Sequence, residues 1–332
     1  MTKLPGQIFA RAIAEAATGK NGENSMRTNP WAVPLRAAAL ICAATLVMGL
    51  NRKADNLPDT PLPGPSGVTA LSGQVVDLNG HGLAGVELMV GAARTLSDDN
   101  GRFLLAYVIP GKTVLQIDGR GAGGKRNADY GYYQVRVEAV AGQTTVLPFK
   151  SWLPRIDHAH DVTIASPTTA EVVVRTPQMP DFELRIAPGV VIRDVDGQVV
   201  TRVGITPVPS DRTPVPVPEQ FEVPTVPIIQ PGAACLYDTS GGIGIARMIF
   251  PNFQHELPKA RATLWRYEPD ANGWRAYGMG SVSADGRQIV PDPGVVITDF
   301  ASAECDPTTR ARQPSPERPR VHPPGKMQDK KQ

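Results

Sequence analysis

Residues 71–117 read LSGQVVDLNGHGLAGVELMVGAARTLSDDNGRFLLAYVIPGKTVLQI and carry the clearest structural signal in the chain. Short alternating apolar segments are separated by turn-forming dipeptides, of which Asn79-Gly80 and Asn100-Gly101 favour positive φ angles. This pattern predicts a small antiparallel β-sandwich. The expected inward-facing residues are Val75, Leu83, Val86, Leu88, Val90, Phe103 and Leu105.

The same pattern continues on both sides and defines a first domain over residues 69–150. Turn signals recur at intervals of about 8–12 residues, which is typical of sandwiches and not of helical domains. The predicted strands cover residues 72–77, 85–90, 95–99, 102–107, 112–117, 130–138 and 143–149.

This domain resembles the carboxypeptidase regulatory-like family. The resemblance rests on Gly73-x-Val75-x-Asp77-x-x-Gly80-x-x-Leu83-x-Gly85-Val86, Ser97-Asp98-Asp99-Asn100-Gly101-x-Phe103 and Ile109-Pro110-Gly111. It implies a transthyretin-like β-sandwich of a type found in many exported bacterial proteins and often grouped with carbohydrate-binding-like folds. Residues 119–129, a glycine-rich basic loop, depart from the pattern and lack the context of a phosphate loop.

A second β-rich domain is expected over residues 151–304. Asp196-Gly197, Asn272-Gly273 and Asp285-Gly286 are hairpin signals between apolar runs. The proline-rich residues 207–231 should lie at a sheet edge or in an extended polyproline conformation. The expected strands lie within residues 171–175, 182–186, 199–207, 246–250, 262–267, 274–282 and 289–300.

This half is similar to a segment that precedes YD repeats in bacterial RHS-repeat proteins. The similarity rests on FELRIAPGVVI at 182–192, ITPVP at 205–209, PNF at 251–253, LWRYEP at 264–269 and GMGSVSADGRQIVPD at 278–292. It implies the non-catalytic N-terminal scaffold of an RHS-type surface or toxin-delivery system, with a protein partner of RHS/YD-repeat type. No YD repeats follow, and the proline-rich, basic residues 305–332 are expected to form a disordered tail.

The N-terminal region predicts export. Arg27 and Arg36 precede the apolar residues 37–50, so residues 26–50 are expected to form a signal peptide or, with residues 31–50 as the span, an uncleaved membrane anchor. Residues 1–25 are an extension of uncertain start, because Met26 offers a second initiation site. Residues 51–68 are expected to form a proline-rich linker. The β domains would then lie outside the cytoplasm.

Charge and cysteine content narrow the function classes. The formal net charge is +2 and aromatic residues make up 6% of the chain, so nucleic acid is not an expected partner. Cys42, Cys235 and Cys305 include no CxxC spacing for zinc. In an exported chain Cys235 and Cys305 could form a disulfide, and the alternative is two unpaired thiols.

Two groups of residues are candidate sites. His158 and His160 would lie on one face of a strand and could ligate a metal, although the sequence supplies no third ligand; the alternative is a solvated interdomain segment. Trp265, Tyr267, Trp274 and Tyr277 surround the Asn272-Gly273 turn and could form a sugar-stacking platform, or they could pack across the hairpin.

The sequence therefore predicts an all-β chain: two consecutive antiparallel β-sandwich domains after an N-terminal hydrophobic helix, followed by a disordered tail. The expected function is a non-catalytic exported structural or interaction module without a cofactor. The alternative is a carbohydrate-binding module that recognises a cell-surface glycan. A metal-dependent hydrolase using His158 and His160 is the third hypothesis.

Overall fold

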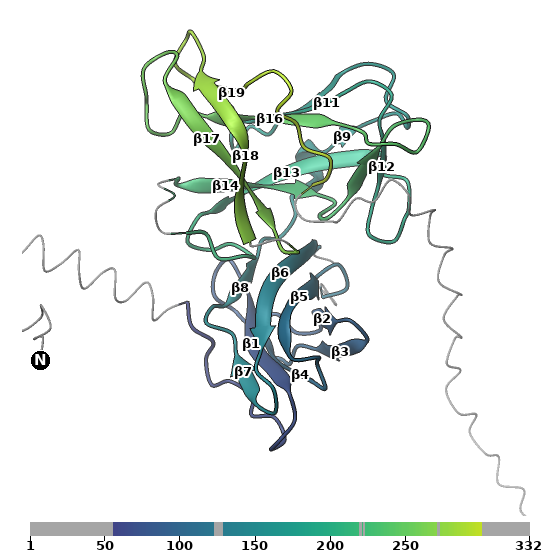
Figure 1. Ribbon diagram of the computed structural model, residues 1–332, viewed down its shortest axis with the longest axis vertical. Helices are drawn as coiled ribbons and strands as arrows, with labels where there is room; N and C mark the ends of the chain where they lie inside the picture. The colour runs from purple at the N-terminus through teal and green to yellow at the C-terminus, as the bar shows by residue number, and fades with distance from the viewer. Residues whose placement is uncertain (1–55, 123–128, 219–220, 222, 271–272, 301–332) are drawn as a thin grey trace, which may run out of the picture. The chain divides into compact units, whose positions relative to one another are not determined.

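The computed structural model describes residues 56–122, 129–218, 221, 223–270 and 273–300, all within one compact unit. This part of the chain is all-β, as the sequence predicts, and its helical content is one 3-10 turn, η2 (His158–His160) (Figure 1). A search of the same residues finds no helix long and apolar enough to cross a membrane. The expected hydrophobic helix, residues 31–50 and the tail lie outside the described residues.

Two sheets form the first half of the described chain, residues 56–153. In one sheet β1 is central, and it pairs with β4, β7 and β8. The other sheet has the order β3-β2-β5-β6. The bounds are β1 Ala70–Asp77, β2 Glu87–Val90, β3 Ala93–Leu96, β4 Arg102–Ala106, β5 Gly111–Asp118, β6 Tyr132–Ala139, β7 Thr144–Val146 and β8 Ser151–Leu153.

The first half is not wholly antiparallel, which corrects the expectation from the sequence. β1 pairs in parallel with β7, from Ala70 opposite Thr144, and with β8, from Val75 opposite Ser151. The reason is topological: the chain leaves β6 in the other sheet and crosses over, so that it returns along β1 in the same direction. β8 is also a strand that the turn signals do not predict.

The core of the first half lies between these two sheets. All seven residues predicted to face inward belong to this one buried cluster, and Phe103 and Leu105 are each 1% exposed. The strand alternation read from the sequence therefore places the buried face correctly.

Residues 56–68, the described part of the expected proline-rich linker, lie along the first half. Trp152 Nε1 donates to Asn56 Oδ1 at 2.7 Å, and the Gly64 amide donates to Thr144 Oγ1 at 3.0 Å. The Lys150 ammonium also lies 3.1 Å from the Asp59 carboxylate. These contacts hold the proline-rich segment against the sheet that contains β1.

The second half, residues 162–300, contains three sheets with the orders β10-β11-β16-β19-β18-β17, β14-β13-β9 and β12-β15. The bounds are β9 Val162–Thr163, β10 Val172–Val174, β11 Glu183–Ile186, β12 Val191–Arg193, β13 Arg202–Pro209, β14 Thr225–Gln230, β15 Cys235–Tyr237, β16 Ala246–Pro251, β17 Arg261–Glu268, β18 Gly273–Val282 and β19 Gln288–Pro291.

The predicted turn chemistry of this half is confirmed. Gly197, Gly273 and Gly286 all have positive φ angles, of 76°, 80° and 74°, which glycine adopts without strain. The last two join β17 to β18 and β18 to β19. Pro227 lies in β14, an outer strand of its sheet, as expected. Pro207 and Pro209 instead lie in β13, the middle strand, which corrects the expectation; β9 pairs only with Arg202 and Val203, so it does not reach these prolines.

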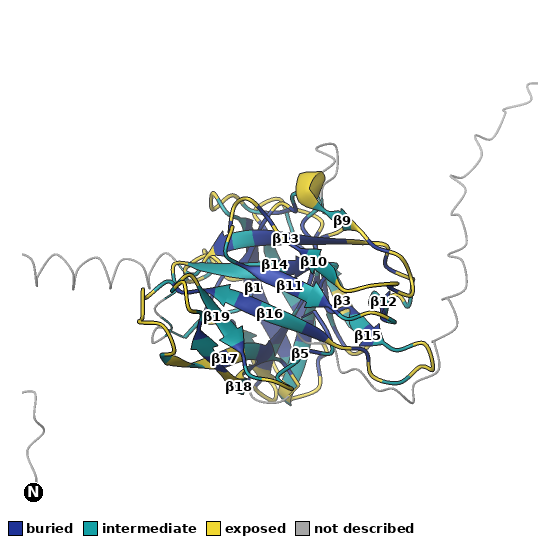
Figure 2. Ribbon diagram, turned by 90° about the horizontal axis from the view of Figure 1, so that it is seen from above, coloured by how far each residue is buried: buried dark blue, intermediate teal, exposed yellow. Residues whose placement is uncertain are grey.

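A second core fills the centre of this half, with Phe182, Leu184 and Phe300 among its fully buried members. Strands such as β1 and β11 are mostly buried, whereas the η2 turn beside β9 is exposed (Figure 2). The described chain thus has one apolar core in each half.

Candidate functional site

The predicted aromatic residues lie on the β17–β18 hairpin, but they do not form one set. Tyr267 is directly opposite Trp274, and Trp265 is opposite Ala276. The next pair joins Leu264 to Gly278, so Tyr277 is the extra residue of a β-bulge. Tyr277 packs against the second core instead, and its pKa is raised by burial.

The remaining three rings gather around a fourth ring, Phe221, that the sequence pattern does not reveal; two of the ring contacts are edge to face, and the one between Phe221 and Trp265 is tilted at 45°. Tyr267 and Trp274 have ring centres 5.8 Å apart with planes at 71°. Phe221 lies 5.1 Å from Trp265 and 5.3 Å from Trp274, the latter at 90°. Phe221 belongs to the proline-rich segment, where no alternation marks it as part of a site.

The polar ends of two of these rings are bound to backbone. The Arg136 amide of β6 donates to Tyr267 Oη at 2.8 Å, and Trp274 Nε1 donates to the Pro216 carbonyl at 2.7 Å. Burial raises the pKa of the Tyr267 phenol, so it stays neutral. With these hydrogen bonds made, the rings present apolar surface to their surroundings.

That surface lines a cavity of about 480 Å³. Its walls come from β14 and β17, with β16 and the segment around Phe221 contributing apolar side chains. Tyr132, Tyr133 and Gln134 of β6 line it from the first half. Trp265, Tyr267 and Trp274 thus share one cavity, whereas Tyr277 does not line it.

A charged pair borders the same cavity. Arg266 of β17 donates to both carboxylate oxygens of Asp299, and both side chains are largely buried. The carboxylate balances the guanidinium charge in this position. Polar side chains elsewhere in the wall, among them Gln134, Gln230 and Glu256, accompany the apolar majority.

His158 and His160 lie in the exposed η2 turn and not on the expected strand. Asp157 caps this turn by accepting from the Ala159 amide at 2.9 Å, which explains the local conformation. His160 Nε2 is 4.0 Å from Asp157, while His158 contacts other carboxylates. The two rings therefore have separate partners.

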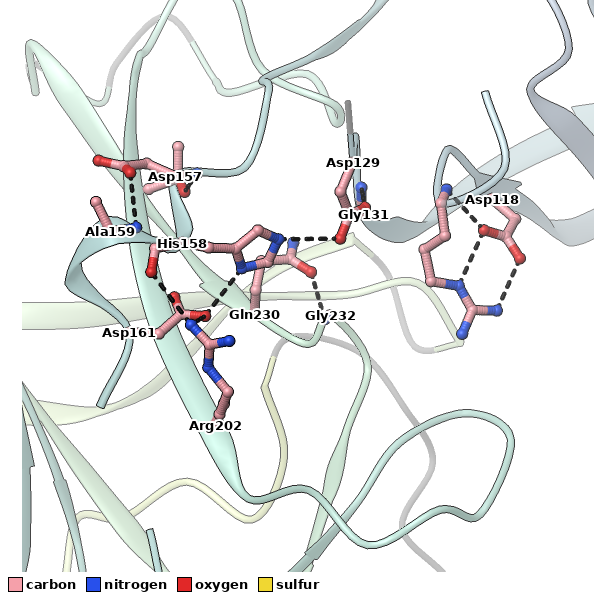
Figure 3. A network of polar contacts seen from close by, with 12 residues as sticks. Asp118, Asp129, Gly131, Asp157, His158, Ala159, Asp161, Arg202, Gln230 and Gly232 are labelled. Atoms are coloured by element: carbon pink, nitrogen blue, oxygen red, sulfur yellow. Dashed lines mark hydrogen bonds and ion pairs between the residues drawn. The ribbon is translucent and has the colours of Figure 1, made fainter. Parts of the chain in front are cut away.

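Both ring nitrogens of His158 contact aspartates (Figure 3). Nδ1 lies 2.9 Å from Asp161 Oδ2, and Nε2 lies 3.3 Å from Asp129 Oδ2. The hydrogen bond with Asp161, followed by the charge of both carboxylates, raises the pKa of His158 above its ordinary value. Arg202 also lies near, 3.4 Å from Asp161 Oδ2.

This cluster borders a smaller cavity of about 210 Å³ that Arg120 and Gln230 also line. Within the described ranges no group of three His, Cys, Asp or Glu side chains is placed to hold a metal ion. The predicted metal site of His158 and His160 therefore has no third ligand from this part of the chain. The cluster instead links Asp129, before β6, with Asp161, before β9.

Cys235 lies in β15 and is disulfide-bonded. The chain has two other cysteines, Cys42 and Cys305, and both lie outside the described residues. The predicted pairing with Cys305 stays a prediction.

Comparisons with known proteins name no family for this chain. No family model and no curated protein matches it. Among solved structures, the TIE protein of Bacillus anthracis is similar at 13% identity with a TM-score of 0.24. The match covers 68% of this chain and 44% of that one, so this chain spans less than half the length of that protein. A likeness at this level carries no argument about fold or function.

Proposed function

We propose that this protein is a non-catalytic exported interaction module. In this proposal it consists of two consecutive β-sandwich domains and binds its partner in a cavity formed mainly by the second one, with β6 of the first at its border. The observation that carries the proposal is the cavity of about 480 Å³ whose wall includes Trp265, Tyr267 and Trp274. The RHS resemblance of the second half suggests that the chain acts as a scaffold part of an RHS-type surface or toxin-delivery system.

The size and chemistry of the cavity support a binding role. Protein interiors are close-packed, and voids larger than a water molecule are few in a domain. Ligand pockets measure about 300–1,000 Å³ and have mainly apolar and aromatic walls with a few oriented polar groups. This cavity falls within that range.

Export is supported by two features of the chain. Cys235 is disulfide-bonded, and disulfides persist in oxidising compartments. The apolar residues 37–50 follow Arg27 and Arg36, as in signal peptides and membrane anchors. We therefore place the β domains outside the cytoplasm, either released or held through residues 31–50.

The alternative partner is a cell-surface glycan. Trp265 favours this alternative because it is 42% exposed, so part of its ring is open to a ligand. The ring angles of 45°, 71° and 90° in the cluster favour a protein partner, because rings set at these angles do not form the flat platform on which a sugar stacks.

Binding assays with the purified chain separate these partners. Biolayer interferometry against a purified YD-repeat protein should give a saturable signal that decreases in Trp265→Ala and persists in Trp152→Phe, a tryptophan outside the cavity. Glycan-array binding that depends on Trp265 or Trp274 would instead establish the carbohydrate-binding alternative. The absence of any signal in both assays would contradict the proposal.

A further inference from the structure

The large cavity is bordered by β14 and β17, and the residues that line it show how it meets the edge and the faces of each strand. Successive side chains of a strand point to opposite faces of its sheet, so a face contributes every second residue to a cavity wall. In β14, all six residues from Thr225 to Gln230 line the cavity. In β17, all seven residues from Arg261 to Tyr267 do so. The cavity therefore borders the edges of these strands and is not confined to one face of either.

Both edges are open among the described residues. β17 ends the six-stranded sheet and pairs with β18, and β14 ends the sheet β14-β13-β9 and pairs with β13. No backbone hydrogen bond joins the outer edge of either strand to another strand in this part of the chain. Such an edge carries a row of N–H and C=O groups that can pair with an added strand.

The two edges differ in the backbone N–H donors that they offer to an added strand. β14 contains Pro227, which has no N–H, so a row of donors along this edge is interrupted. β17 has the sequence RATLWRYE and contains no proline. β17 is therefore the better template, and β14 forms the opposite wall.

We propose that the partner inserts an extended segment that adds as a strand to the outer edge of β17. The segment carries apolar side chains at alternate positions, and these fill the cavity between β17 and β14. This inference rests on the proposed function, because it specifies how the cavity takes its partner. The partner is thus a peptide segment of another protein, recognised through its backbone and its apolar alternation.

The dimensions and wall chemistry of the cavity match such a segment. Seven residues of β17 at about 3.3 Å per residue give an edge of roughly 23 Å, which is the length of an ordinary strand. Val226, Ile228, Met248 and Phe250 line the cavity with apolar side chains. Backbone pairing provides affinity in this mode of recognition, and pockets for alternate side chains provide specificity.

One end of the β17 edge is closed and the other is open. Near the closed end, Tyr267 Oη accepts from the Arg136 amide, and Arg136 Nη1 donates to the Pro269 carbonyl. At the other end, the Arg261 side chain is 51% exposed and is paired with Asp292. We expect the segment to enter at Arg261 and to run toward Trp265.

A selection from a phage-displayed random heptapeptide library on the full chain tests this proposal. We expect enrichment of sequences with apolar residues at alternate positions. An enriched peptide should lose affinity about tenfold or more when its alternate amides are N-methylated, because the side chains stay while the backbone donors are lost. This control requires no change in the protein.

Matched variants locate the site. Val226→Phe fills the cavity and should weaken peptide binding about tenfold or more. Val199→Phe makes the same change at a position that is 47% exposed and outside the cavity, and it should bind normally. Circular dichroism spectra and melting temperatures verify that both variants fold.

The other outcomes are distinguishable. Peptides without alternation, or binding that is insensitive to N-methylation, would overturn strand addition. The chain can also be tested with arrayed glycans and with palmitate, a fatty acid whose apolar tail could occupy an apolar cavity. Binding of either one without peptide binding would overturn strand addition, but the cavity would still be a binding site. If the chain binds no peptide, glycan, palmitate or YD-repeat protein, the proposed function itself fails.

Discussion

His158 is the residue through which Asp129 of the first half and Asp161, which lies just before the second half, share one partner. Its ring lies between Asp129, which precedes β6, and Asp161, which precedes β9. Arg202 shares Asp161, and Asp157 contacts His160 instead. A protonated imidazole gives both aspartates at His158 an opposite charge, whereas the neutral ring leaves them less well balanced.

We predict a pH-dependent contribution of His158 to stability. A histidine whose pKa is raised in the folded state stabilises that state fully below the ordinary pKa of 6.5, and the contribution disappears as the pH rises through the folded-state pKa. Because the side chain is 50% exposed, the effect should be below about 1 kcal/mol. Urea unfolding from pH 5.5 to 8.5 should show a difference between wild type and His158→Gln that shrinks with rising pH.

The same substitution at another histidine provides the control for this experiment. His255→Gln makes the same change in a loop residue outside the cluster, and its difference from wild type is the reference against which the trend of His158→Gln is judged. A difference between wild type and His158→Gln that stays constant across the range would contradict the role of His158.

Single residues of the sites were only partly predictable. Trp265, Tyr267 and Trp274 were identified because aromatic residues around a turn meet across a hairpin. Tyr277 was grouped with them because alternation cannot reveal the bulge that moves it to the second core. Phe221 gives no sequence signal, since its role arises from contact with strands far along the chain.

Among the elements, the turn at Asn100-Gly101 depends most strictly on glycine. Gly101 has a φ of 73° and is buried against β1, so an added β-carbon would overlap the Val75 carbonyl oxygen. Gly85 has nearly the same φ, 74°, but no heavy atom would meet its β-carbon. The two positions therefore separate backbone strain from steric overlap.

We predict that Gly85→Ala lowers the free energy of unfolding by about 1–2 kcal/mol, which is the cost of the left-handed conformation alone. Gly101→Ala should cost about 1–3 kcal/mol more, because the neighbouring backbone must move. Denaturant unfolding of the two variants and the wild type measures both values. Equal losses of unfolding free energy in the two variants would contradict this prediction, because they would show that steric overlap at Gly101 adds nothing to the backbone strain.

The elements whose chemistry is local were predictable from the sequence. Asn-Gly and Asp-Gly turns and strand alternation located most strands of both halves, because they depend on neighbouring residues. The parallel pairing of β7 and β8 with β1 was missed, because a crossover depends on how whole sheets stack. The contacts of Asn56 and Gly64 were missed for the same reason.

For the whole molecule, we predict that the disulfide joins Cys235 to Cys305. Cys235 forms a β-bridge with Asp299, which precedes Cys305 by only a few residues. Peptide mapping of the unreduced protein by mass spectrometry should recover this pair. A link to Cys42 would contradict the assignment. Reduction should lower stability by about 2–4 kcal/mol.

The cavity is a property of the whole molecule and was not predictable from the sequence. Its walls come from β6, β14 and β17, which are separated by long stretches of chain and belong to three different sheets. Each strand is recognisable on its own, yet nothing local shows that two open edges border one space. Three of the four predicted aromatic residues lie in the cavity wall, but their positions in the sequence do not show that a cavity forms beside them.

Amide hydrogen exchange along β17 tests the central claim most directly. The measurement compares the free chain with the chain saturated by a peptide from the selection. Strand addition predicts that the outward-pointing amides between Arg261 and Tyr267, those not directed at β18, become protected on binding, while the amides of β2 and β5 in the first core are unchanged, because only an open edge gains hydrogen bonds. Binding that leaves the exchange of β17 unchanged would contradict the account.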